Sequence, residues 1–149
     1  MIAPGAFSQS ILDWRARNAW PSLLWNHEWD SPASVLGVVT DMVEDERGLL
    51  VTGHLDLDHE PAVAVYKAMK SGRITAFSFA YAVIAEHKRD DGVNVLDELD
   101  VLDVTITPNP ANRNARLVSV KTAPDLEPAT ELEQLTKQLD ALAQPGPLR

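Results

Sequence analysis

The sequence has 149 residues, of which 45% are hydrophobic, and a formal net charge of −9 at pH 7. This length suits one globular domain with its own core. The sequence contains no cysteine, which excludes disulfides, thiolate catalysis and cysteine metal sites. The negative charge argues against nucleic acid as a partner, because a phosphate-binding surface needs clustered Lys and Arg. No run of residues has the length of a membrane span, and no signal-peptide pattern opens the chain, so no membrane partner is expected.

The first thirty residues are rich in tryptophan. A weak helix is predicted for residues 8–16 and a short strand for residues 23–27, with Trp25 and His27 on one side of the strand. All four tryptophans of the chain lie in this region, and three of them bracket His27. The cluster favours a role in the core, with a groove beside the histidine as the alternative.

The middle of the chain predicts a hairpin and a helix. Strands at residues 35–43 and 49–57 are joined by a polar turn that ends in Gly48. The clearest helix of the chain follows at residues 60–71. A proline suits its first turn, and Gly72 is placed to cap its C-terminal end.

A buried strand is predicted for residues 74–84, which are β-branched, aromatic or small, without Pro or Gly. Side chains alternate between the two faces of a strand. The bulky face holds Phe77, Phe79, Tyr81 and Val83, and the other face holds Ala76, Ser78, Ala80 and Ala82. Ser78 is therefore a lone hydroxyl among alanines, with space for a polar side chain or a substrate backbone. The simpler interpretation is a strand serine that bonds to a nearby carbonyl.

A polar loop is expected at residues 86–94, then a strand at residues 99–107 and a last short strand at residues 115–120. In the strand at 99–107, alternation puts three polar side chains on one face. These are Asp103, Thr105 and Thr107.

The composition changes after residue 122. Prolines flank residues 130–143, where four leucines repeat at spacings of three, four and three, which is typical of an amphipathic helix. Such a helix needs a partner surface, so weak self-association or docking on a partner is expected. We predict a mainly β domain with helices (α+β) over residues 1–122, and a Pro-flanked linker and amphipathic helical tail over residues 123–149.

A serine activated by a neutral imidazole is the candidate for chemistry in a chain without thiols. His27 is flanked by bulky apolar residues that could fix its tautomer, whereas His87 lies in a charged loop. An imidazole base needs an orienting acceptor. Asp103 is the best-placed carboxylate and Asp100 is the second. The residue types thus offer a Ser78, His27 and Asp103 triad.

A metal site is the rival interpretation. Alternation puts His54, Asp56 and Asp58 on one strand face, with His59 just beyond, and such ligands could hold Zn²⁺ or Mn²⁺. The simpler reading is the polar edge of a hairpin strand that leads into a helix cap. The spacing matches no specific zinc pattern, so neither a metal nor another cofactor is predicted.

Several segments match a known family in order and with similar spacing over about residues 2–120. They are Pro4-Gly-Ala-Phe7, Leu23-Leu-Trp-Asn-His27, Leu36-Gly-Val-Val39, Glu46-Arg-Gly-Leu49, Val51-Thr-Gly53, Lys70-Ser-Gly72, the Ser78 strand, Asp103-Val-Thr-Ile-Thr107 and Pro110-Ala-Asn112. No single motif is specific, but the ordered set resembles the prohead (capsid-maturation) serine proteases of tailed bacteriophages.

The resemblance implies a small closed or partly open β-barrel of the herpesvirus-protease (assemblin) type. It implies a serine endopeptidase inside the phage procapsid, in the cytoplasm of the bacterial host. Such enzymes cleave scaffold, or the scaffold-like part of the major capsid protein, and often themselves. The family's catalytic histidine and serine fall on His27 and Ser78, and its acidic residue, usually glutamate, falls on Asp103. The alternative is a non-catalytic capsid-assembly or scaffold protein that retains the fold.

The sequence also departs from the family pattern. Phe79-Ala80-Tyr81 follows the serine where relatives usually carry a small residue soon after it, and Asp103 is one methylene shorter than glutamate. The family tends to have a further strand before Pro4, so an uncovered sheet edge is expected. Backbone amides within residues 112–116 are the expected oxyanion donors, and self-cleavage is expected near residues 122–130.

Overall fold

The computed structural model describes residues 1–121. The elements of this part, in chain order, are α1 (Ser8–Ala16), β1 (Ser22–Trp25), the short 3₁₀ helix η1 (Pro32–Ser34), β2 (Val35–Asp45), β3 (Gly48–Leu55), α2 (Glu60–Lys70), β4 (Phe77–Lys88) and β5 (Asn94–Ile106). A first compact unit comprises Met1–Val118. The predicted tail of residues 123–149 lies outside the described residues, so the boundary at residue 122 stays a prediction. Neither described α-helix is long and apolar enough to cross a membrane.

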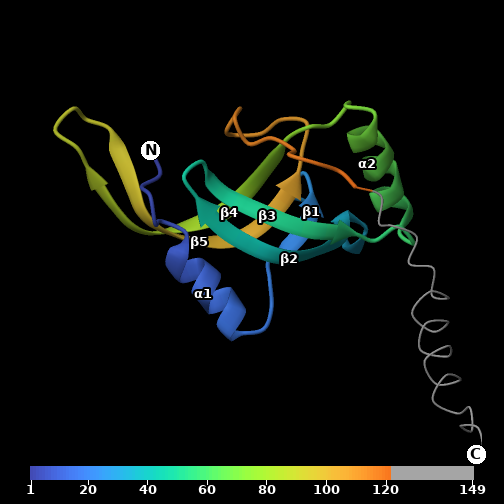
Figure 1. Cartoon of the computed structure of the whole chain (residues 1–149), viewed down its shortest axis with the longest axis horizontal. Helices are drawn as coiled ribbons and strands as arrows, with labels where there is room; N and C mark the ends of the chain where they lie inside the picture. The colour runs from blue at the N-terminus through green and yellow to red at the C-terminus, as the bar shows by residue number, and fades with distance from the viewer. Residues whose placement is uncertain (122–149) are drawn as a thin grey trace, which may run out of the picture. The chain divides into compact units, whose positions relative to one another are not determined.

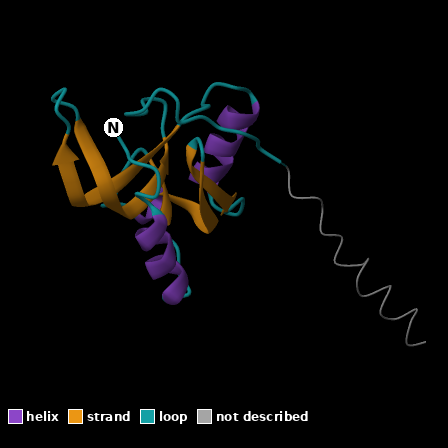
Figure 2. Ribbon diagram, turned by 60° about the vertical axis from the view of Figure 1, so that its left-hand side comes forward, coloured by secondary structure: helices purple, strands orange, loops and turns teal. Residues whose placement is uncertain are grey.

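Within residues 1–121, five strands form one sheet in the order β3-β2-β1-β5-β4 (Figure 1). β1 runs parallel to β5 and antiparallel to β2, and the remaining neighbours are antiparallel. The mainly β architecture with helices is confirmed. The outer strands β3 and β4 do not pair with each other, so the described sheet is open and is not a closed barrel (Figure 2).

β5 forms the centre of the core because β1 and β4 flank it and α1 packs against it. Along this strand, apolar and polar side chains alike are buried. The fully or almost fully buried ones are Leu99, Val101, Asp103, Val104, Thr105 and Ile106. A central strand with two covered faces can bury apolar side chains freely, but each buried polar group needs a hydrogen-bond partner.

Helix α1 is tied to the sheet by polar contacts near its N-terminal end. The Ser10 hydroxyl donates to Asp100 Oδ1 at 2.9 Å and accepts from the Val101 amide at 2.9 Å. At its start, no side chain of the helix caps it. The Glu44 carboxylate on β2 instead holds the segment that leads into the helix, accepting from the Gly5 amide at 2.7 Å and the Phe7 amide at 3.2 Å.

Helix α2 matches its predicted bounds to one residue. Its C-terminal end is a Schellman motif, in which the Gly72 amide donates to Met69 O and the Arg73 amide donates to Ala68 O. Gly72 has a φ of +72°, which glycine adopts without steric cost. The helix packs against β2 and β3.

The β2–β3 hairpin is also confirmed, and its turn is closed by Asp45. Asp45 Oδ1 accepts from the Arg47 amide at 2.7 Å and the Gly48 amide at 3.2 Å. The hydrogen bond from the Arg47 amide holds the pKa of Asp45 below its ordinary value. A lowered pKa means that this contact supports the turn at neutral pH and is lost as the pH falls through that pKa.

Two predictions for the second half need correction. The loop expected at residues 86–94 is shorter, because β4 runs on to Lys88 and β5 begins at Asn94. No strand forms at residues 115–120. A single isolated bridge joins Arg116 to Ala76, just before the start of β4.

Replacing Ser10 tests how α1 is held. Ser10→Ala leaves the buried Val101 amide without its acceptor, so we expect the free energy of unfolding to fall by about 1–3 kcal/mol. Equilibrium urea unfolding followed by circular dichroism measures this. Gln9→Ala, on the exposed side of the same helix, is the control and should change stability by about 0.5 kcal/mol or less. Equal losses of stability in Ser10→Ala and Gln9→Ala would contradict the role of the Ser10 hydroxyl in holding α1 to β5.

Candidate active site

His27 lies in a tight turn directly after β1. The prediction that the strand continues to His27 is wrong, because β1 ends at Trp25. Asn26 and His27 have φ angles of 50° and 57°, in the left-handed region that few residues other than glycine adopt. Two consecutive residues in this conformation turn the chain back, and the Glu28 amide donates to Trp25 O across the turn at 3.0 Å. The turn, rather than strand alternation, directs the imidazole.

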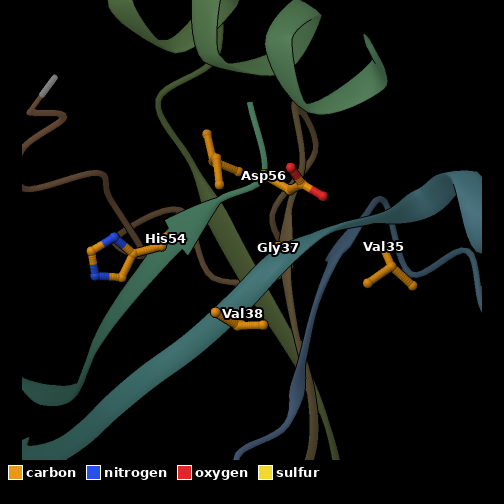
Figure 3. Close-up of a pocket in the computed structure, with 6 residues that line it drawn as sticks. Val35, Gly37, Val38, His54 and Asp56 are labelled. Atoms are coloured by element: carbon orange, nitrogen blue, oxygen red, sulfur yellow. The ribbon is translucent and has the colours of Figure 1, made fainter. Parts of the chain in front are cut away.

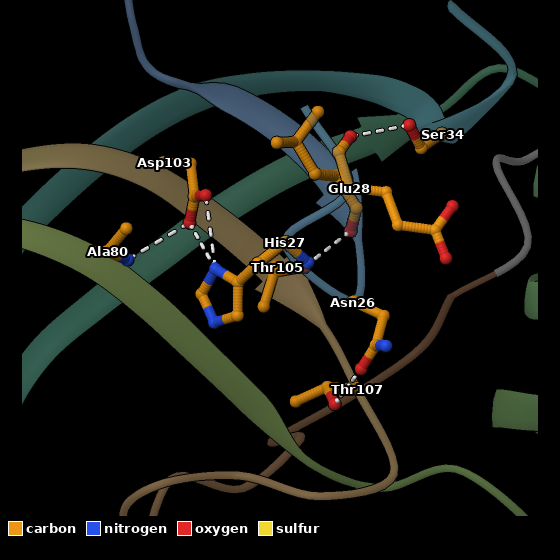
Figure 4. A network of polar contacts seen from close by, with 9 residues as sticks. Asn26, His27, Glu28, Ser34, Ala80, Asp103, Thr105 and Thr107 are labelled. Carbon is orange, nitrogen blue, oxygen red and sulfur yellow. Dashed lines mark hydrogen bonds and ion pairs between the residues drawn. The ribbon is translucent and has the colours of Figure 1, made fainter. Parts of the chain in front are cut away.

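The imidazole of His27 contacts the Asp103 carboxylate. Nδ1 lies 3.0 Å from Oδ1 and 3.1 Å from Oδ2 (Figure 4). Asp103 is completely buried, whereas the His27 side chain is 35% exposed. An ionised carboxylate can only accept, so the neutral ring carries its proton on Nδ1. Nε2 is then left with a free lone pair, which is the state that a general base requires.

A β-bulge supplies the second partner of Asp103. The register of β4 against β5 shifts between Ala80 and Tyr81. At this point the Ala80 amide donates to Asp103 Oδ1 at 3.0 Å. Bulges redirect a backbone group at the site where they occur. Here the redirected amide anchors the carboxylate to which His27 is bonded.

Ser78 lies on β4 beside this pair. It is opposite Thr105 in the β4–β5 register, and Ala80 is opposite Asp103. Side chains opposite each other in an antiparallel pair share a face, so Ser78 is on the face that carries Asp103. The Ser78 residue is 9% exposed. Within residues 1–121, the Ser78 hydroxyl makes no hydrogen bond to any residue, and His27 is no exception. The simpler interpretation, a bond from this hydroxyl to a nearby carbonyl, is therefore not supported by the described residues.

The other sequence candidates are engaged elsewhere. Asp100, the second choice of orienting acid, accepts from Ser10. His87 lies on the exposed part of β4 and contacts Asp97 at 2.6 Å. Of the proposed metal ligands, His59 donates from Nε2 to Ala33 O at 2.8 Å. In residues 1–121, no group of three or more His, Asp or Glu side chains could hold a metal ion.

The expected oxyanion donors are partly used within their own loop. The Asn114 amide donates to Asn112 Oδ1 at 2.9 Å, and the Ala115 amide donates to Asn112 O at 3.0 Å. These two amides therefore do not point freely toward a substrate. The Ala115 carbonyl accepts from the Phe77 amide, which holds the loop beside the start of β4.

Two cavities lie outside the serine, histidine and aspartate group. One, of about 330 Å³, is lined by Val35, Gly37, Val38, His54, Leu55 and Asp56 (Figure 3). The other, of about 420 Å³, lies between α2 and the segment after β1, and Trp25 and Glu28 line it. All four tryptophans are at least partly exposed, so the expectation of an aromatic core is wrong. Of the four, Trp25 lines one of these two cavities, and His27 lines neither, so the alternative of a groove beside the histidine stays a prediction.

Sequence reasoning missed the residues that hold the histidine turn. The Asn26 amide and the His27 amide bond to β5, and the Asn26 side chain bonds to Thr107, directly after β5. The alternation that places Thr105 and Thr107 on the face of Asp103 was the available signal. It did not reveal their partners, because the pairing of β1 with β5 joins segments about eighty residues apart.

A histidine bonded to a buried aspartate, with a serine on the same face, is the arrangement of a serine hydrolase. The chain belongs to the Caudovirus prohead serine protease family, whose model matches residues 1–128. The chain is 26% identical over 140 residues to the prohead protease of Enterobacteria phage HK97. This match covers 89% of the present chain and 58% of the relative. The chain thus spans 58% of the length of this curated relative. No solved structure matches. These findings confirm the resemblance to prohead proteases.

Asp103→Asn tests the tautomer of His27. The amide keeps the shape of the carboxylate but brings an NH₂ group to Nδ1, so we expect the ring proton to move to Nε2. Long-range ¹H–¹⁵N spectra of the imidazole distinguish the two tautomers. Asp100→Asn is the control and should leave His27 unchanged, because Asp100 bonds to Ser10. An Nδ1 proton that persists in Asp103→Asn would contradict this account.

Proposed function

We propose that this chain is a serine endopeptidase in which Ser78 is the nucleophile, His27 the general base and Asp103 the orienting acid. The observation that carries the proposal is the pair of contacts between His27 Nδ1 and the buried Asp103 carboxylate, at 3.0 and 3.1 Å. This contact leaves Nε2 without a proton, and Ser78 shares the face on which the ring lies.

The chemistry follows acyl transfer. Ser78 Oγ forms a bond to the peptide carbonyl carbon while its proton moves to His27 Nε2. The carbon–nitrogen bond then breaks, and the leaving amine takes the proton. Water repeats the sequence, in which His27 first removes its proton and Ser78 is released with the proton restored. Asp103 stays ionised and stabilises the imidazolium in each half.

The hydroxyl of Ser78 must approach Nε2 for this step. Catalytic hydrogen bonds are often long in the absence of substrate and tighten in the complex, so the missing bond is compatible with the mechanism. The exposed side of the imidazole, at 35% for the whole side chain, gives a substrate access to the ring.

The natural substrates that we propose are the scaffold or the scaffold-like part of the major capsid protein, and the protease itself. Family membership supports this, since the family is described as prohead serine proteases. The site of action would be the procapsid, assembled in the host cytoplasm. The net charge of −9 would favour approach of basic substrate segments at low ionic strength.

Co-expression with the phage capsid protein, analysed by intact mass, tests the function. We expect a shortened capsid protein, a shortened protease, or both, with the wild type and neither with Ser78→Ala. Ser78→Ala removes one oxygen that bonds to no described residue, so the fold should be preserved. Ser71→Ala, at the end of α2, is the matched control and should cleave as the wild type does.

Cleavage that persists in a folded Ser78→Ala protein would overturn the assignment of the nucleophile. The absence of cleavage in the wild type would instead support a non-catalytic capsid-assembly or scaffold protein. In that case, deletion of residues 123–149 should alter capsid assembly while Ser78→Ala does not.

A further inference from the structure

We infer that Thr105 on β5 and Thr107, directly after the end of β5, are positioning residues that hold the turn of His27 over Asp103. This inference rests on the proposed function, because it assigns the two threonines a role in activating Ser78. Within residues 1–121, neither threonine makes a hydrogen bond to the imidazole ring. They act through the backbone of His27 and the side chain of its neighbour Asn26.

Thr105 holds the backbone of His27 directly. Its hydroxyl oxygen accepts from the His27 amide at 2.9 Å and donates its own proton to Leu24 O at 3.1 Å (Figure 4). Thr105 is completely buried. The hydroxyl of Thr105 therefore links Leu24 in β1 to His27, the second residue of the left-handed pair, and it acts as both donor and acceptor.

Thr107 holds the other residue of the turn. Its hydroxyl donates to Asn26 Oδ1 at 2.8 Å and accepts from the Asn109 amide at 3.1 Å. The Asn26 amide donates to Ile106 O at 3.1 Å, so it lies against the same strand. The backbone amide of each left-handed residue thus donates to β5, that of Asn26 to Ile106 and that of His27 to Thr105.

The backbone conformation explains why such anchors are needed. Left-handed φ angles are uncommon in residues other than glycine, and although Asn and His adopt them more readily than most, two in succession are best maintained where the surroundings hold them. Without the anchors, Asn26 and His27 can relax toward extended backbone. The ring would then leave Asp103, and a displacement of about 1 Å can slow a positioned reaction by about a hundredfold.

The anchors and the carboxylate lie close together in the sequence. Asp103 and Thr105 occupy alternate positions on one face of β5, which ends at Ile106, and Thr107 follows directly. The histidine is placed by the bond from its amide to Thr105, by the bond from Asn26 to Thr107 and by the Asp103 carboxylate at its ring. Residues 103–107 supply all three of these contacts.

The experiment uses the full chain and a substrate-independent probe, diisopropyl fluorophosphate. Ser78 Oγ forms a bond to phosphorus, fluoride leaves, and His27 takes the serine proton. The labelling rate, followed by intact mass, reports activation of Ser78. The ¹H and ¹⁵N signals of the His27 Nδ1–H group report its contact with Asp103 without any reaction.

We expect Thr105→Val to label at least about tenfold more slowly than the wild type, and its His27 Nδ1–H signal to shift or vanish. Thr105→Ser restores the hydroxyl and should restore both readouts. Thr52→Val is the matched control, since Thr52 is an exposed threonine on β3, and it should label at the wild-type rate.

Asn26→Gly decides the matter if Thr105→Val does not fold. Glycine accepts a φ of 50°, so the turn can still form, but glycine also reaches many other conformations and is no longer held by the bond to Thr107. We expect a folded protein with slower labelling and a broadened or shifted His27 signal.

Wild-type labelling rates and an unchanged His27 signal in both Thr105→Val and Asn26→Gly would overturn the positioning role and leave the proposed function intact. A wild type that is not labelled at Ser78 would overturn the proposed function. The His27 signal would then still decide the positioning role, because it requires no catalysis.

Discussion

The buried carboxylate of Asp103 is the constraint on which the site depends. A carboxylate shielded from water is costly unless donors surround it. Asp103 lies on β5, between β1 and β4, and receives one donor from the bulge of β4 and one from the ring of His27. Neither donor is close to Asp103 in the sequence. The carboxylate therefore joins β4, β5 and the turn after β1 in one arrangement.

The strand order makes this arrangement available. β5 pairs with β4 on one side and with β1 on the other, so the serine strand and the histidine turn flank the strand of the acid. The parallel pairing of β1 and β5 ends with Trp25 opposite Ile106. The chain turns immediately afterwards, which brings His27 back over the face of β5. A longer β1 would carry the histidine away from Asp103.

The remainder of the described chain supports the sheet at a distance from this group. Helix α1 is fastened by Ser10 to β5 and by Glu44 to β2. Helix α2 packs near the other end of β2 and β3, beside the cavity that Trp25 and Glu28 line. β3 and β4 are the two edge strands of the described sheet, and they do not pair with each other. Sheet edges of this kind are available for pairing with another segment or chain.

The sequence by itself determined the elements whose signals are local. Helix α2 followed from its proline, its apolar spacing and Gly72, and the β2–β3 hairpin followed from alternation and a polar turn. The residue types also selected Ser78, His27 and Asp103, and the ordered segments indicated the family. The choice between Asp103 and Asp100 stayed open, because residue type does not distinguish two aspartates three positions apart on one strand.

Only the tertiary structure decided how these residues meet. It placed Asp100 against Ser10 and Asp103 against His27, through contacts between residues about ninety and about seventy-six positions apart. The expected strand at His27 is a left-handed turn in the structure, and all four tryptophans are at least partly exposed. The physical reason is the same in each case. Strand pairing, the bulge at Ala80 and the bonds from β5 to the turn are long-range, and no local pattern of residues encodes their register.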